Sequence, residues 1–371
     1  MSPVSAERAE RLVEAVGEAG LDQLIVGDLV RPGDSGPDAS ADIRWLTGFT
    51  GTSAIAMVGA QSRLFLTDFR YTERAESEVG EAFERVTVEG RLLSEIAPRL
   101  AGRVGFDDSA TSVANLRKLE AAIADGDGSA ELVATSGLVA GLRRRKDASE
   151  QEAIAAAAKL ADDAYRAGLE AGLIGRSERQ VAQAAETRIR ELGGEPAFPT
   201  IVAGGANGAL PHAEASEREI RAGELVVWDM GARLGGYCSD CTRTFAAGEP
   251  GERARDVYEL VRRAQAAGLE AVGAGVGGRD ADEAARAIIR EAGYDEAFGH
   301  GLGHGVGLEV HEPPRLGRRS EDVLEAGDVV SVEPGVYLPE RFGVRIEDLV
   351  VITDDGHRNL SSLPKELLVV D

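Results

Sequence analysis

Four acidic residues on apolar segments have the type and spacing to do chemistry. Asp229 follows the apolar run LVVW, Glu333 follows VVSV, and a glycine stands two residues after each. Asp240 comes eleven residues after Asp229, and Glu347 comes fourteen after Glu333. A carboxylate within an apolar strand is costly unless it is paired or binds a cation. Four of them in one interior would repel one another, so we expect a pair of divalent metal ions between them; the alternative is edge-strand or turn acids that face water.

An internal repeat pairs these carboxylates. Three motifs return at offsets of 100, 100 and 104 residues: RAGLEAG at 166–172 as AAGLEAV at 266–272, RELG at 190–193 as REAG at 290–293, and AGELVVWDMG at 222–231 as AGDVVSVEPG at 326–335. Each copy is predicted to run helix, helix, strand. The repeat aligns Asp229 with Glu333 and gives each half a second carboxylate. Two such halves facing one another predict an interface with pseudo-twofold symmetry, which is a common location for a site.

Histidines concentrate in one glycine-rich segment. GHGLGHGVGLEVHEPP, residues 299–314, holds His300, His304 and His311, three of the five histidines in the chain. Neutral imidazole is a common ligand of transition metals, and glycines let backbone and imidazole approach a ligand closely. His212, in AGGANGALPH, is a fourth candidate, although by itself it is better interpreted as a loop histidine beside a proline.

The elements that must position these residues divide into two domains. Alternating apolar segments predict a small mixed α/β domain over 1–140 and a second domain over 141–371. The first domain is expected to have helices from Ser5 and at 92–100 and 112–123, strands at 21–26, 53–58, 63–68 and 103–107, and a loop rich in glycine, proline and aspartate at 31–42. The cations at 143–146 are interpreted as a solvated boundary rather than a phosphate patch. A capping box of Ser149 with Glu152 is expected to open the next, alanine-rich helix.

Composition narrows the class of function. The 371 residues carry 41 Lys and Arg against 64 Asp and Glu, a formal net charge of −23, which disfavours nucleic acid and anionic membranes as partners. No apolar run approaches the roughly 18 residues of a membrane span, and the first residues lack the apolar core of a secretory signal. We therefore expect a cytoplasmic globular protein with no nucleic-acid or membrane partner.

Two short motifs do not predict sites of their own. GAGVGG at 273–278 follows a predicted helix rather than a strand, which argues against a nucleotide site. Cys238 and Cys241 lack the second pair of ligands that a zinc site needs, and we interpret them as packing cysteines.

The motifs around the candidate ligands resemble those of a known family. DMGARLGGYCSD, HGLGHGVG, EPGVY and GVRIED are similar to the metal-binding motifs of the pita-bread metallopeptidases, in the branch of prolidase and aminopeptidase P, in order over about residues 150 to 365. IRWLTGFTGTSAIAMV and TDFRY resemble that branch's creatinase-like amino-terminal domain. The resemblance implies an α+β fold class, with a small mixed α/β creatinase-like domain followed by a pita-bread catalytic domain. It also implies five metal ligands, all of them present: Asp229, Asp240, His304, Glu333 and Glu347.

Such ligands imply two divalent metal ions per chain, with Mn the best fit and Co, Zn or Fe as alternatives. In that family the ions activate a water that attacks the scissile carbonyl. Glu333 would be both ligand and proton shuttle, and His212 and His311 would hydrogen-bond the carbonyl oxygen and the tetrahedral intermediate. Tyr337 and Arg345 would orient the ligand carboxylates on the substrate side of the site.

The resemblance further implies three substrate contacts. His300 matches a position near the substrate, and Phe198 would form an apolar wall of the prolyl pocket. Arg315, in HEPPRL, would hold the free carboxylate of an Xaa-Pro dipeptide through its guanidinium. The alternative interpretation of Arg315 is a solvated surface arginine.

We therefore expect an enzyme that hydrolyses the Xaa-Pro bond of short, proline-containing peptides, most simply a dipeptidase. The first alternative is an Xaa-Pro aminopeptidase that acts on longer peptides. A creatinase-like amidinohydrolase lacks the intact ligand set, methionine aminopeptidase usually lacks the first domain, and a non-catalytic binding module would have lost ligands. We also expect a homodimer, with apolar surface provided by WLTGFTG at 45–51.

Overall fold

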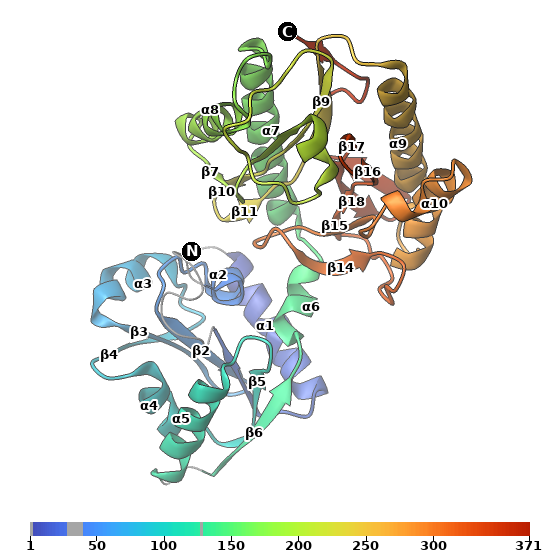
Figure 1. Ribbon diagram of the computed structural model, residues 1–371. Helices are drawn as coiled ribbons and strands as arrows, with labels where there is room; N and C mark the ends of the chain where they lie inside the picture. Colours follow the sequence, from blue (N-terminus) through green and yellow to red (C-terminus); the bar gives the residue numbers. More distant parts are fainter. Residues whose placement is uncertain (1–2, 28–39, 127–128) are drawn as a thin grey trace. The chain divides into compact units, whose positions relative to one another are not determined.

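The computed structural model describes residues 3–27, 40–126 and 129–371. The chain forms two compact units, Met1–Arg143 and Arg144–Asp371 (Figure 1), where the sequence suggested a boundary near residue 140. Most of the loop expected at 31–42 lies outside the described residues. No helix in the described ranges is long and apolar enough to cross a membrane.

The first unit is a mixed six-stranded sheet with the order β4-β3-β2-β1-β5-β6. All the helices and strands that the sequence predicts here are present, and its core contains Ile25, Leu66, Val104 and Leu119. The strands are β1 Gln23–Val26, β2 Ala54–Gly59, β3 Arg63–Asp68, β4 Glu84–Val88, β5 Gly102–Asp107 and β6 Ala130–Thr135. The helices are α1 Pro3–Glu18, α2 Ala41–Thr47, α3 Thr72–Glu78, α4 Leu92–Ile96, α5 Val113–Ala124 and α6 Leu138–Arg144.

The segment WLTGFTG is buried inside the first unit, so the expectation that it provides apolar surface is wrong. Trp45, Leu46 and Phe49 are each at most 1% exposed. The guanidinium of Arg8 lies over the Trp45 indole, and the Phe49 ring packs edge-on against Phe65 with 4.9 Å between centroids. Burial of these apolar side chains in the core of the first unit stabilises that unit, so they do not form an apolar surface.

Of the four cations at the domain boundary, the side chains of Arg143, Arg144 and Lys146 are largely buried in ion pairs, so the interpretation as a solvated face is wrong for these three. Arg145 alone of the four is more than half exposed. The pairs are Arg143 with Asp42, Arg144 with Asp328, Arg145 with Glu325, and Lys146 with Glu312. Because each cation has a carboxylate partner, the cluster leaves little free positive charge for a phosphate.

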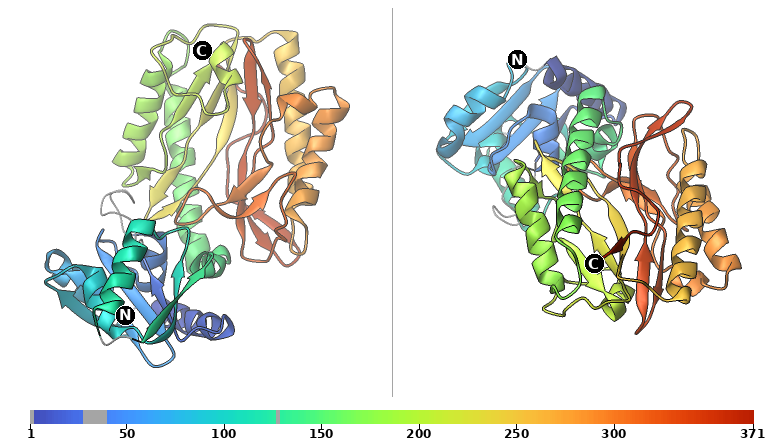
Figure 2. Two further views of the ribbon diagram at one scale, coloured as in Figure 1. Left: turned by 60° about the horizontal axis from the view of Figure 1, so that its bottom comes forward. Right: turned by 90° about the horizontal axis from the view of Figure 1, so that it is seen from above.

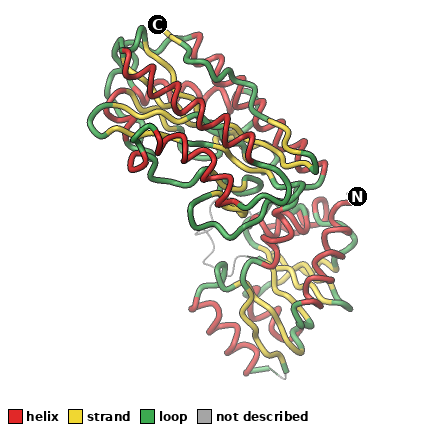
Figure 3. The backbone as a smooth tube through the Cα atoms, turned by 90° about the vertical axis from the view of Figure 1, so that its right-hand side faces the viewer, coloured by secondary structure: helices red, strands yellow, loops and turns green. Residues whose placement is uncertain are grey.

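The second unit contains two halves that each run helix, helix, strands, which confirms the predicted repeat. Figure 2 shows the helices of each half on opposite sides of the central strands, and Figure 3 traces the same helices beside the strands. The first half has α7 Ala148–Glu170, α8 Glu178–Glu191, β8 Ile201–Gly204, β9 Glu224–Asp229 and β12 Thr242–Ala247. The second has α9 Glu252–Ala271, α10 Gly278–Glu291, β13 Gly303–Gly305, β15 Val329–Val332 and β18 Asp348–Thr353.

The strands of the two halves form two principal sheets, with the orders β20-β12-β9-β8 and β14-β13-β15-β18-β19. In the first sheet, β20 pairs in parallel with β12 although it follows the whole second half in the chain. The remaining strands are β7 Glu195–Pro196, β10 Ala232–Leu234, β11 Tyr237–Cys238, β14 Glu312–Leu316, β16 Gly335–Leu338, β17 Phe342–Arg345, β19 Gly356–Asn359 and β20 Val369–Val370.

Glycines mark corresponding points of close packing in the two halves. A Cβ at Gly168 of α7 would clash with the Trp228 indole, and a Cβ at Gly268 of α9 would lie 2.9 Å from Val332 Cγ1. Trp228 and Val332 each precede one of the aligned carboxylates. The small residue therefore lets each long helix approach the strand that presents an acidic residue to the interface.

Helix α7 begins under a capping box of Asp147 and Glu150, not of Ser149 and Glu152 as expected. The Asp147 carboxylate accepts from Glu150 N at 2.9 Å, and the Glu150 carboxylate accepts from Asp147 N at 3.0 Å. The Ser149 hydroxyl donates to Asp147 Oδ1 at 2.6 Å. Glu150 is also buried against Tyr237, whose hydroxyl donates to it at 2.9 Å, and this tertiary contact selects the earlier start.

The two motifs set aside have structural roles. GAGVGG is the connection between α9 and α10, so no strand precedes it as a nucleotide site requires. Cys238 and Cys241 are buried free thiols that donate to the carbonyls of Leu308 and Glu347, which confirms that they are packing cysteines.

Candidate metal centre and substrate cleft

Three of the predicted carboxylates converge where the two halves meet. Asp229, Asp240 and Glu347 are buried, and one carboxylate oxygen of each lies within 4.8 Å of the others. Asp229 ends β9, Asp240 comes just before β12, and Glu347 lies between β17 and β18. The Glu347 N–H donates to the Thr242 carbonyl at 3.0 Å, so a backbone hydrogen bond joins the halves beside the carboxylates.

His304 and Glu333 complete the group of five residues, which we call the ligand cluster. His304 Nε2 lies 3.3 Å from Glu333 Oε1 and 3.7 Å from Asp240 Oδ2. His304 Nδ1 donates to the Gly305 carbonyl at 3.1 Å, a contact that fixes the ring so that Nε2 faces the carboxylates. The Ser331 hydroxyl donates to Glu333 Oε1 at 3.1 Å and accepts from His304 N at 3.0 Å.

Burial and mutual repulsion act on the cluster's carboxylates. Burial, followed by the negative charges of Glu347, Asp229 and Glu333, raises the pKa of Asp240 well above its usual range. Burial and the charges of Glu333 and Asp229 do the same to the pKa of Glu347. Burial also raises the pKa of Asp229, although the charge of Arg345 opposes that rise. These three groups are costly as anions unless further positive charge is supplied.

Glu333 differs from the other carboxylates of the cluster. Burial raises its pKa, but the hydrogen bond with His304 and the positive charge of Arg345 act in the opposite direction, and the pKa lies below its ordinary range. Among the carboxylates of the cluster, Glu333 is the one whose pKa is lowered, which favours its anion.

The ligand cluster fits a divalent metal centre. Asp229 Oδ1 and Glu347 Oε1 are buried and have no hydrogen-bond partner within the described part of the chain. The other oxygen of each is fixed: Asp229 Oδ2 accepts from Arg345 Nη2 at 2.7 Å, and Glu347 Oε2 accepts from Thr242 Oγ1 at 2.7 Å. A buried unpartnered oxygen costs free energy unless a ligand contacts it. Four carboxylates and one imidazole suit first-row divalent ions.

Arg345 connects the cluster to His300. Its Nε donates to Thr242 Oγ1 at 2.8 Å, and its Nη1 donates to the Tyr337 hydroxyl at 2.8 Å. The Tyr337 hydroxyl donates in turn to His300 Nε2 at 2.9 Å, because His300 Nδ1 donates to the Gly301 carbonyl at 2.8 Å. Both ring nitrogens of His300 are thus engaged within the protein. Burial lowers the pKa of His300, which favours this neutral ring.

The cluster opens into a cleft of about 1590 Å³. Six of the predicted catalytic and substrate-binding residues outside the ligand cluster line it: Phe198, His212, His300, His311, Arg315 and Arg345. Tyr337 does not line the cleft and instead contacts Arg345 and His300 from behind. The His311 ring lies 4.3 Å from the His304 ring, centroid to centroid. Arg315 is exposed, and among the described residues its guanidinium has no ion-pair partner, while its backbone N–H donates to Asp322.

Sequence reasoning missed two hydroxyl residues of the site, Thr242 and Ser331. Asp240 and Thr242 are two residues apart, as are Ser331 and Glu333. Side chains two residues apart in a strand point to the same face, so the sequence spacing indicated that each hydroxyl lies beside a ligand carboxylate. The predicted site contains acidic, basic, histidine and aromatic side chains but neither of these two hydroxyls.

Comparisons with known proteins agree with the arrangement of the site. The chain matches Metallopeptidase family M24 over residues 152–354 and the Creatinase/Prolidase N-terminal domain over residues 8–145. It is 39% identical to the uncharacterized peptidase YqhT of Bacillus subtilis (strain 168), over 98% of this chain and 100% of that protein. Among solved structures, it is similar to an Xaa-Pro dipeptidase from Bacillus anthracis, with a TM-score of 0.91, 38% identity and coverage of 99% and 100% of the two chains. An X-Pro aminopeptidase from Thermotoga maritima MSB8 gives a TM-score of 0.87, 34% identity and coverage of 98% and 100%.

Proposed function

Because the chain belongs to metallopeptidase family M24 and carries a creatinase/prolidase amino-terminal domain, we propose that it hydrolyses the Xaa-Pro bond of short peptides. The family, the α+β fold with a pita-bread second domain, and the peptidase class predicted from the motifs are confirmed. The observation that carries the proposed activity is the ligand cluster at the cleft, in a chain 38% identical to a protein named Xaa-Pro dipeptidase.

The ligand cluster would hold two divalent ions, which when bound supply Lewis acidity and lower the pKa of water. Glu333 accepts a proton from the attacking water and passes it to the leaving nitrogen of proline. The water oxygen bonds the carbonyl carbon to give a tetrahedral intermediate with a negative carbonyl oxygen, and the bond from that carbon to nitrogen breaks as the intermediate collapses and the nitrogen takes the proton from Glu333. The products are a carboxylate on Xaa and a protonated secondary amine on proline, which together hold both protons of the water.

His212 and His311 donate hydrogen bonds to the carbonyl oxygen as it gains negative charge. Burial, with the nearby positive charge of Arg315, lowers the pKa of His311, so its ring is a neutral donor at neutral pH. His300 contacts the substrate through its ring, since both its nitrogens are engaged. Phe198 contributes an apolar wall for the proline ring.

Arg315 pairs with the free carboxylate of a carboxy-terminal proline, which makes the dipeptide the preferred substrate. An aminopeptidase that acts on longer peptides is the second candidate, because the cleft continues past Arg315 along residues 316–322. The 34% identity with an X-Pro aminopeptidase also supports this candidate.

Three further proposals complete this function. Manganese is the resident metal, since the donor set is mostly oxygen with one imidazole. The protein is a homodimer, for which Phe69 of the first unit, 76% exposed, offers an apolar contact in place of the buried WLTGFTG segment. The protein acts in the cytoplasm, consistent with buried cysteines that form no disulfide. Elemental analysis tests the metal, light scattering the dimer, and cell fractionation the location.

Product analysis with Xaa-Pro and Xaa-Pro-Yaa peptides tests the substrate. A charge-assisted contact of Arg315 predicts a roughly 10- to 150-fold preference in kcat/KM for the dipeptide. Arg315→Ala should remove most of that preference and leave metal content unchanged. Arg319→Ala, at a second arginine of the cleft lining, is the matched control and should preserve it. If the wild-type protein cleaves Xaa-Pro-Yaa as well as Xaa-Pro, the aminopeptidase replaces the dipeptidase.

A further inference from the structure

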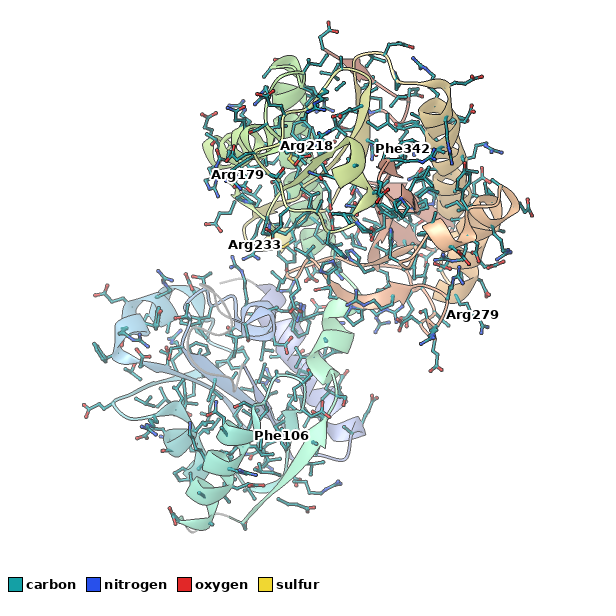
Figure 4. The ribbon with its side chains drawn as sticks, viewed as in Figure 1. Phe106, Arg179, Arg218, Arg233, Arg279 and Phe342 are labelled. Carbon is teal, nitrogen blue, oxygen red and sulfur yellow. The ribbon has the colours of Figure 1, made fainter. Side chains whose placement is uncertain are left out.

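Glu178 is a buried carboxylate that the proposed reaction does not use. It lies in the first turn of α8, and its side chain is 0% exposed. It accepts hydrogen bonds from Gly204 N at 2.8 Å, Asn207 Nδ2 at 3.0 Å, Ser216 N at 3.2 Å and Ser216 Oγ at 2.6 Å. The guanidinium of Arg218, labelled in Figure 4, lies 3.9 Å away. These donors and this cation satisfy a charge that would otherwise be costly to bury.

The donors to Glu178 come from both sides of His212. Gly204 ends β8 and Asn207 follows it, whereas Ser216 lies four residues after His212 in the connection to β9. The Glu178 carboxylate therefore joins the two ends of the segment 204–216, which contains His212, through hydrogen bonds. We call residues 205–216 the His212 loop.

Arg345 connects the tip of the His212 loop to the ligand cluster. The Pro211 carbonyl accepts from Arg345 Nη1 at 3.2 Å, and the same arginine holds Asp229. His212 is exposed and Leu210 is 60% exposed, whereas Ala213, next to His212 in the chain, is buried. Hydrogen bonds at the base of the loop and at Pro211 therefore act together with the buried Ala213 to define the position of His212.

We propose that Glu178 is a positioning residue that fixes the His212 loop so that His212 reaches the substrate carbonyl. The inference rests on the proposed hydrolysis of Xaa-Pro peptides, to which it adds a residue outside the cleft lining. In the second half, the position aligned with Glu178 by the offset of 100 is Gly278 and carries no carboxylate. Other residues contact the segment around His300. There Arg286 donates to the His300 carbonyl at 2.6 Å, and Asp282 accepts from Leu302 N at 2.9 Å.

The first test is a double-mutant cycle on kcat and KM for an Xaa-Pro dipeptide. Glu178→Gln keeps the size of the side chain but removes its charge, and we expect kcat to fall roughly 10- to 100-fold, with a smaller change in KM, because a misplaced catalytic group costs about that much. In a His212→Ala background the same substitution should change kcat less than about 2-fold, since the group it positions is gone. An equal fall in both backgrounds would overturn the proposal.

Asp162→Asn is the matched control. Asp162 is also a buried carboxylate of the first half that accepts from a serine N–H and hydroxyl, those of Ser362, but it does not contact the His212 loop. Its substitution should leave kcat within about 2-fold of wild type in both backgrounds. A fall in kcat that matches that of Glu178→Gln would show a general effect of losing a buried charge and would contradict the proposal.

The second test does not depend on activity. The chain has five histidines, so the imidazole signals of histidine-labelled protein are few, and His212→Ala identifies the signal of His212. Glu178→Gln should shift or broaden that signal, and Asp162→Asn should leave it in place. If Glu178→Gln fails to fold, Ser216→Ala removes the hydroxyl donor alone and should act in the same direction. An unmoved His212 signal would refute the positioning role, whereas a wild-type protein that cleaves no Xaa-Pro peptide would refute the proposed function and leave this second test intact.

Discussion

The two halves of the second unit share a backbone plan, yet each fixes a carboxylate of the other. In the first half, Asp229 is held by Arg345, which belongs to the second half. In the second half, Glu347 is held by Thr242, which belongs to the first. The repeat therefore places carboxylates at equivalent positions, and side-chain hydrogen bonds between the halves orient these carboxylates toward one another. Neither half contains a complete ligand cluster.

The halves differ in what they add to the shared plan. The second half supplies His304 and the anionic Glu333, and the first supplies no histidine to the cluster. Substitutions at matched positions can therefore separate what the repeat provides from what one half alone provides.

The largest difference is expected between Glu333→Gln and Asp229→Asn, which change aligned positions. Both should weaken metal retention, because both residues belong to the cluster. When metal is restored in excess, Glu333→Gln should remain roughly 10²- to 10⁴-fold below wild type in kcat, since it also loses the proton acceptor. Asp229→Asn should recover more of its activity. Elemental analysis and steady-state kinetics measure both, and equal recovery would mean that Glu333 has no separate proton role.

Substitution of the two hydroxyl residues should have a smaller effect. Thr242→Val removes the donor to Glu347 and the acceptor for Arg345, so we expect a loss of roughly 10- to 100-fold in metal affinity or kcat/KM. Ser331→Ala removes one contact to Glu333 and one to the His304 backbone, and we expect less than about 10-fold. Metal titration followed by kinetics distinguishes the two. A larger loss for Ser331→Ala would show that the second half depends less on the first than the contacts indicate.

Substitution of the glycines at equivalent positions of α7 and α9 should lower the free energy of unfolding. Gly168→Ala should lower the free energy of unfolding by about 1–3 kcal/mol, because the new methyl meets the buried indole of Trp228. Gly268→Ala should cost less, since Val332 Cγ1 and the Leu302 side chain are the tips of smaller groups. Gly141 of α6 has open space around it, so Gly141→Ala is the control and should stabilise by about 0.5–1 kcal/mol. Thermal unfolding measures all three, and equal costs at the two packed positions would contradict this ranking.

The smallest expected effect is a change in the pH dependence of stability on substitution of Asp162, a buried carboxyl of α7 that α9 lacks. Burial raises the pKa of Asp162, whereas an offset of 100 places the surface residue Arg262 on α9. A carboxyl whose pKa is raised on folding contributes full stability below its unfolded pKa, and that stability is lost as pH rises through the folded pKa. Asp162→Asn removes this titration, so its stability relative to wild type should improve between about pH 4 and pH 7. Urea unfolding at both values measures the difference, and a decline over this range would show that contacts with Ser362 dominate instead.

The sequence revealed much of the fold because its strongest signals are local and periodic. Alternating and helical apolar patterns predicted elements of the first unit, and the repeated motifs predicted the two halves. Alignment of Asp229 with Glu333 also predicted which side chains would face one another. These inferences need only neighbours in the chain or a comparison of the chain with itself.

The errors come from partners that lie far apart in the chain. The buried pair of Lys146 and Glu312 joins residues 166 positions apart, and a run of cations gives no sign of such a partner. The start of α7 was misplaced because the Tyr237 hydroxyl, distant in sequence, selects Glu150. Tertiary contacts of this kind decide burial, and burial decides whether a polar or aromatic side chain is surface or core.

Strand β20 has a consequence for synthesis of the chain. It completes the sheet of the first half, where Ala246 N donates to the Leu368 carbonyl at 2.9 Å and Gly248 N donates to the Val370 carbonyl at 2.8 Å. A ribosome makes β12 before the whole second half and β20 after it. The edge of β12 therefore stays unpaired during translation of the second half, exposed to other chains that could pair with it. The sheet of the first half therefore gains its last strand only after the second half has been made.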